Sequence, residues 1–136
     1  MKEIKETVLY FHDFMTNEDQ TKEEIRHLQR EFHDNGLLVR EIKETETPPF
    51  RDKEYYDILL FDWGGAMIGN SCMRHFCISI LEEALEKPSK VYIMSSHYTT
   101  EAMKEAQKSF KEANGELPAN VFLNIKDACK LLLLIQ

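Results

Sequence analysis

The sequence predicts a three-layer α/β fold in which helices cover both faces of a parallel sheet. Short runs of β-branched and aromatic residues alternate along the chain with longer segments whose apolar residues recur at helical spacing. The third short run, residues 57–62, is apolar throughout between two aspartates, as in a central strand buried on both faces. Strands that alternate with helices pair in parallel through right-handed crossovers. We therefore expect one parallel sheet between two layers of helices.

Five segments carry the strand signal. They are residues 7–12, 37–43, 57–62, 90–96 and 120–125. The connection between the second and the third, residues 44–56, contains Pro48, Pro49 and charged residues without a helical period. We predict a five-stranded parallel sheet of flavodoxin-like order, 2-1-3-4-5, in which the helix between strands 2 and 3 is missing.

Four segments carry the helix signal. They are residues 18–35, 71–87, 100–114 and 126–136. Gly36 ends the first helix, Pro88 forbids continuation of the second, and Gly115 ends the third. Residues 131–135 of the last helix are apolar on all sides, so this helix either packs deeply or meets another chain, such as a second copy.

Length and composition limit the class of protein. With 136 residues, of which 43% are hydrophobic and 30% charged, and with no visible linker, residues 1–136 are expected to form a single α/β domain. The net charge of −7 repels a phosphate backbone, so nucleic acid is not an expected partner. The chain has no long apolar segment and no signal-peptide pattern, so we expect a cytoplasmic protein without membrane contact. Cys72, Cys77 and Cys129 lack CxxC spacing and are expected to be free thiols.

The fold prediction selects a ligand site without any motif. In an open parallel sheet, ligands bind at the carboxyl ends of the strands, where neighbouring crossovers leave in opposite directions. For the predicted order, this place lies between the first and third strands. The polar residues at the strand ends are His12, Asp13, Asp62, Ser95, Ser96, His97, Asn124 and Lys126. We expect them to converge on one site.

Four strand ends also share a pattern with a known family. The segments are LYFHDF at residues 9–14, DILLFDW at 57–63, VYIMS at 91–95 and FLNIK at 122–126. Together they resemble the response-regulator receiver domains of the chemotaxis type. The resemblance implies that Asp62 accepts a phosphoryl group, that Asp13 and Asp62 hold magnesium, that Ser95 supplies a switch hydroxyl and that Lys126 pairs with the phosphoryl oxygens.

The chemistry of phosphoryl transfer is consistent with this resemblance. A carboxylate attacks a phosphoryl donor only where a cation and a fixed positive charge offset the charge on the phosphoryl oxygens. Magnesium accepts one or two carboxylates and completes its shell with water. The resemblance therefore makes magnesium the expected cofactor.

The turn after the third strand is a further candidate binding element. Trp63, Gly64 and Gly65 lead towards Ser71, which lies at the start of an expected helix. Accessible backbone N–H groups and a helix N-terminus can hold an anion, although the turn matches neither the Walker nor the dinucleotide pattern. A tight turn needs glycine too, and Trp63 either stacks on a flat ligand or closes the core.

Three functions remain open from the sequence. The leading hypothesis is a binding or signalling module that holds a small phosphate-bearing ligand or a phosphoryl group. The first alternative is a nucleotide- or nucleoside-processing enzyme, in which Asp62 or Asp13 is the nucleophile or base and His12 or His97 moves the proton. The second is a protein-interaction module that dimerises through the C-terminal helix. Structural roles explain the same residues, since aspartates cap backbone N–H groups and histidines can form a polar rim.

Overall fold

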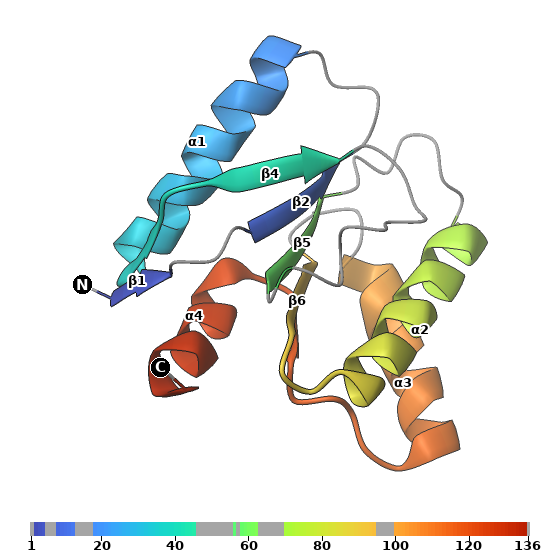
Figure 1. Ribbon diagram of the computed structural model, residues 1–136. Helices are drawn as coiled ribbons and strands as arrows, with labels where there is room; N and C mark the ends of the chain where they lie inside the picture. Colours follow the sequence, from blue (N-terminus) through green and yellow to red (C-terminus); the bar gives the residue numbers. More distant parts are fainter. Residues whose placement is uncertain are drawn as a thin grey trace.

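The computed structural model describes residues 2–4, 8–12, 18–45, 56, 58–62, 70–94 and 100–135. Strands and helices alternate along these residues (Figure 1). The strands are β1 (Lys2–Ile4), β2 (Val8–His12), β3 (Leu37–Val39), β4 (Ile42–Thr45), β5 (Ile58–Asp62), β6 (Val91–Met94) and β7 (Val121–Phe122). The helices are α1 (Glu18–Asp34), α2 (Asn70–Glu86), α3 (Thr100–Asn114) and α4 (Ile125–Ile135). The predicted mixed α/β class is confirmed.

The central sheet is parallel throughout its described strands. Its order is β4-β2-β5-β6-β7. None of residues 58–61 of β5 and 91–94 of β6 exposes more than 2% of its surface. Because these strands carry side chains on both faces of a covered sheet, their residues at these positions are hydrophobic, and only Tyr92 adds a polar atom. The predicted central strand at residues 57–62 is therefore confirmed from Ile58 onwards.

Two hydrophobic cores lie on opposite faces of this sheet. Figure 1 shows α1 and α4 on one side of the sheet and α2 and α3 on the other. The first core joins the sheet to α1 and α4 and contains Leu28, Phe32, Leu37, Val39, Ile42, Ile58, Leu60, Val91, Ile93, Ile125, Ala128, Cys129 and Leu132. The second core joins it to α2 and α3 and contains Leu59, Phe61, Cys77, Ile80, Leu81, Ala84, Tyr92, Met94, Met103, Ala106 and Phe110. Successive residues of β5 and β6 alternate between the two cores, as the pleat of a strand requires.

The predicted helix ends agree with the structure. Gly36 and Gly115 have φ of 91° and 87°, in the left-handed region that favours glycine. Their N–H groups donate to the carbonyl oxygens of His33 and Lys111, at 3.0 and 2.8 Å, and so satisfy carbonyls in the last turns of α1 and α3. α2 ends at Glu86, just before Pro88.

The amino-terminal part of the sheet differs from the prediction. The strand predicted over residues 37–43 is two strands, β3 and β4, separated by the exposed residues Arg40 and Glu41. β3 pairs with β1, a strand that the sequence analysis missed. Lys2 pairs with Leu37, and Val8 pairs with Ile42. The segment from Lys2 to Val8 is therefore one residue longer than the segment from Leu37 to Ile42. The two ladders are therefore offset from each other by one residue, and the two pairs of strands belong to separate sheets.

The predicted fifth strand, residues 120–125, is too long. β7 contains only Val121 and Phe122, and α4 already begins at Ile125. The strand ends early because Asn124 caps α4 through hydrogen bonds with Asp127. The first two residues of the predicted irregular connection belong to β4. Of the rest, only Tyr56 is described, so the predicted absence of a helix between the two strands falls outside the described residues.

The structure bears out deep packing for one side of α4, the first of the two predicted alternatives. Ala128, Cys129 and Leu132 pack in the first core, whereas Leu133 and Leu134 expose 38% and 82% of their surface. One side of the helix therefore packs deeply and its carboxyl end presents leucine to solvent. The predicted dimer stays a prediction.

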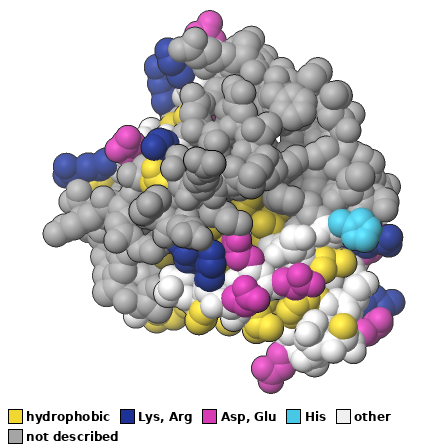
Figure 2. Space-filling view, turned by 45° about the vertical axis from the view of Figure 1, so that its right-hand side comes forward, with side chains coloured by type: hydrophobic (Ala, Val, Ile, Leu, Met, Phe, Trp, Pro, Cys, Tyr) yellow, Lys and Arg dark blue, Asp and Glu magenta, His cyan; other side chains and the backbone are white. Residues whose placement is uncertain are grey.

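The surface over α2 and α3 mixes residue types. Leu85 on α2 and Leu117 after α3 are exposed at 55% and 40%, and acidic side chains lie among hydrophobic ones on this side of the molecule (Figure 2). Single exposed leucines among charged residues are ordinary on protein surfaces. Over the described ranges, no helix has the length and apolar character needed to cross a membrane.

Candidate functional site

The carboxyl ends of the parallel strands lie at one edge of the sheet. β2 ends at His12 and β5 ends at Asp62. α1 follows β2 and packs in the first core through Leu28 and Phe32, whereas α2 follows β5 and packs in the second core. The chain therefore leaves the two neighbouring strands towards opposite faces of the sheet. This arrangement makes the end of β2 and β5 the topological switch point at which ligands bind in open α/β sheets.

His12 and Asp62 are partners in the pairing of β2 with β5. Paired residues of neighbouring strands are about 4.8 Å apart across the sheet. The register thus brings a residue with an imidazole and a residue with a carboxylate side by side at the switch point. Directly before Asp62, Leu60 and Phe61 expose 0% and 1% of their surface, so the pair follows immediately on the buried part of the strand.

Ser71 and Lys126 lie at the starts of helices. Ser71 is in the first turn of α2, which contains no acidic residue to offset the positive end of the helix. Lys126 is an exposed residue in the first turn of α4, which follows the edge strand β7. The other predicted site residues lie outside the described residues; they are Asp13, Trp63, Gly64, Gly65, Ser95, Ser96 and His97.

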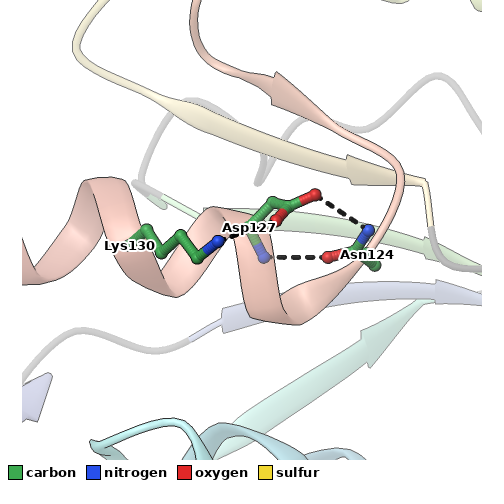
Figure 3. Close-up of polar contacts among 3 residues, drawn as sticks. All are labelled: Asn124, Asp127 and Lys130. Carbon is green, nitrogen blue, oxygen red and sulfur yellow. Dashed lines mark hydrogen bonds and ion pairs between the residues drawn. The ribbon is translucent and has the colours of Figure 1, made fainter.

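Asn124 caps the start of α4 through two hydrogen bonds with Asp127 (Figure 3). The Asn124 Oδ1 accepts a hydrogen bond of 2.8 Å from the N–H of Asp127, and its Nδ2 donates one of 3.0 Å to the Asp127 Oδ2. Lys130 adds an ion pair, with 3.6 Å between its Nζ and the Asp127 Oδ1. Asn124, predicted at the ligand site, therefore has a structural partner. The pattern of Asn followed three residues later by an acid was a readable sequence signal for this cap.

Replacement of Asn124 with alanine is expected to lower the free energy of unfolding by about 0.5 to 2 kcal/mol, because one N–H at the start of α4 loses its acceptor. Urea unfolding followed by circular dichroism measures this change. Lys130→Ala is the matched control. Its ion pair is exposed, so the variant should differ from the parent by less than about 1 kcal/mol. Equal stability of Asn124→Ala and the parent would contradict the capping role.

Among the described side chains, perturbed titratable groups lie in the two cores. Burial raises the pKa of Cys77 to about 11. Burial, and then the nearby Glu31 carboxylate, raises the pKa of Cys129 to about 11. Both are therefore protonated and unreactive at neutral pH, as expected for buried free thiols. The side chain of Cys72 lies outside the described part.

Tyr92 is a buried polar group in the second core. Its hydroxyl makes no hydrogen bond of ordinary geometry within the described part of the chain. Burial, and then the Glu83 carboxylate on α2, raises the pKa of Tyr92 above its usual value. The phenol is therefore neutral at physiological pH, and its place among apolar side chains gives it a packing role.

A groove along α1 lies apart from the switch point. An open groove of about 450 Å³ along α1 is lined by Glu23, Glu24, Arg26, His27 and Arg30, whose charges are of both signs. Across the described residues, no group of three or more His, Cys, Asp or Glu side chains is arranged to hold a metal ion.

The chain has no recognisable relatives in three comparisons. No protein-family model, no curated protein and no solved structure matches it significantly. No family is therefore assigned, and the site must be interpreted from its own residues.

Proposed function

We propose that the protein is a small binding or signalling module that holds a phosphate-bearing ligand or a phosphoryl group at the carboxyl edge of a flavodoxin-like sheet. The observation that carries this proposal is the pairing of His12 with Asp62 where the chain leaves β2 and β5 towards opposite faces. Open parallel sheets bind ligands at this position. The first turn of α2, without acidic residues, supports an anion as the ligand.

Asp62 is the proposed acceptor in the phosphoryl-transfer form of this function. One carboxylate oxygen attacks the phosphorus atom of a donor such as acetyl phosphate, a new O–P bond forms, and the O–P bond of the donor breaks to release acetate. A divalent cation offsets the charge that gathers on the phosphoryl oxygens. The receiver resemblance names magnesium, held by Asp13 and Asp62, for this task, with Lys126 as the fixed positive charge.

Intact-protein mass spectrometry tests the acceptor role. After incubation with acetyl phosphate and Mg²⁺, the parent protein should gain the mass of one phosphoryl group, and Asp62→Asn should gain nothing, because an amide does not form an acyl phosphate. Asp34→Asn is the matched control, since Asp34 is an aspartate with 69% side-chain exposure at the far end of α1, and it should react like the parent.

A ligand screen covers the binding form of the proposal. A phosphate-bearing ligand present at about 100 times its dissociation constant stabilises the fold by about 2.7 kcal/mol and so raises the melting temperature. This shift should be lost in Asp62→Ala and kept in Asp34→Asn. If no donor gives an adduct and no phosphate-bearing compound moves the melting curve, the proposed function is wrong.

A further inference from the structure

The sheet register places a nitrogen-donor residue beside an oxygen-donor residue. His12 and Asp62 are each the last residue of their strand, and they pair across β2 and β5. Neighbouring strands are about 4.8 Å apart, so the backbones of the two residues are direct neighbours across the sheet. Both residues belong to regular strands, so the pairing of β2 with β5 fixes their backbone positions relative to each other.

The two donor types select among metal ions. Mg²⁺ takes oxygen ligands in near-ideal octahedral geometry and retains its water. Imidazole nitrogen suits Zn²⁺ and other divalent first-row transition ions, which also accept carboxylate oxygen. A histidine paired in register with the central aspartate therefore favours a transition ion over magnesium at this edge.

We propose that His12 and Asp62 form part of a binding site for a divalent transition-metal ion of the zinc class. The proposal takes its location from the proposed function and deepens it. Two protein donors leave coordination positions open, and an open position is where a phosphate oxygen of the ligand can bind. The ion would then supply, beside Asp62, the positive charge that a bound phosphate needs.

Cobalt titration of the full chain tests the site, because Co²⁺ occupies zinc-type sites and absorbs visible light. The Cys72→Ser background removes the one cysteine whose side chain the structure does not describe. We expect a saturable absorption band that a large excess of Mg²⁺ does not reduce and that Zn²⁺ abolishes. His12→Asn and Asp62→Asn should each weaken cobalt binding about tenfold or more.

Two controls separate site loss from general effects. His27→Asn alters an exposed histidine on α1 and Asp34→Asn an exposed aspartate, and both should bind cobalt like the parent. Circular dichroism verifies that each variant is folded. If His12→Asn fails to fold, the NMR signals of His12 in the parent decide, since a bound paramagnetic Co²⁺ must broaden or shift them more than those of His27.

The outcomes distinguish this inference from the proposed function. Cobalt binding that His12→Asn leaves unchanged, or that Mg²⁺ displaces as readily as Zn²⁺ does, overturns the metal inference even where a phosphoryl adduct forms on Asp62. His12-dependent cobalt binding supports it even where no adduct forms and no phosphate-bearing ligand binds, a result that overturns the proposed function alone.

Discussion

Replacement of Asn120 with alanine is expected to lower the free energy of unfolding by about 1 to 3 kcal/mol, since it leaves one buried and two partly buried carbonyl groups without their donor. Asn120 is 6% exposed and precedes β7. Its Nδ2 donates to the carbonyl oxygens of Ala84, Lys87 and Lys90, at 3.1, 3.1 and 2.8 Å.

These hydrogen bonds provide a donor for a carbonyl group at the end of α2. The last carbonyl groups of a helix have no partner within the helix, and α2 ends at Glu86. Asn120 supplies a donor to the Ala84 carbonyl and, through Lys87 and Lys90, ties the following turn to the start of β6. Its own carbonyl accepts from the N–H of Tyr92 at 2.9 Å. Through its side chain and its backbone carbonyl, this one residue links α2, β6 and β7 at the amino ends of the strands, away from His12 and Asp62.

Urea unfolding monitored by circular dichroism measures the effect. Asn114→Ala is a matched control, because the exposed Asn114 also donates from its Nδ2 to a helix carbonyl, that of Phe110, at 3.1 Å. It should cost far less than Asn120→Ala, since water replaces the lost donor. Asn120→Asp keeps the side-chain size and removes the N–H donors, so it should be destabilised at least as much as the alanine variant. Stability of Asn120→Asp close to that of the parent would contradict the anchoring role.

The helices and the central strand could be predicted because their signals are local. The apolar spacing along α1 and α3 and the glycines after them specify both extents and ends, as Gly36 and Gly115 show. The short strand β1 could not be predicted, because three residues carry no period and its strand geometry depends on pairing with Leu37–Val39. The break between β3 and β4 likewise depends on the segment that pairs with them, because the register of β1 with β3 differs by one residue from that of β2 with β4.

Some residues of the candidate site could likewise be placed from the sequence, and the roles of others could not. His12 and Asp62 could be placed at one edge from the sequence, since each follows a recognisable apolar run and parallel strands end at the same edge. Asn120 could not be identified as an anchor, because its three acceptors are 30 to 36 residues away along the chain. Asn124 was assigned to the ligand site from its place after a strand, and its hydrogen bonds with Asp127 show that the helix start decides its role.

Replacement of Phe32 with alanine is expected to have the largest effect on stability, a loss of about 3 to 5 kcal/mol. Phe32 is 0% exposed and lies in the first core, where α1 and α4 meet the sheet. Removal of the ring loses its transfer free energy and leaves a cavity whose walls belong to regular elements and relax only in part. Phe32→Leu keeps most of the volume and should cost much less than the alanine variant, and the two midpoints in urea measure the difference.

Hydrogen exchange on Phe32→Ala tests the division of the molecule into two cores. The sheet separates the first core from the second, so the cavity should lower the protection of amides in α1 and α4 more than that of amides in α2 and α3, wherever exchange proceeds by local opening. Phe110→Ala makes the corresponding change in the second core, so it should lower the protection of amides in α2 and α3 more than that of amides in α1 and α4. Equal loss of protection in all four helices for both variants would show that the two layers open as one unit. Such cooperative opening would couple the opening of α1 to that of α2, although the two helices lie on opposite faces of the sheet. Because α1 follows β2 and α2 follows β5, it would also couple the two strand ends that carry His12 and Asp62.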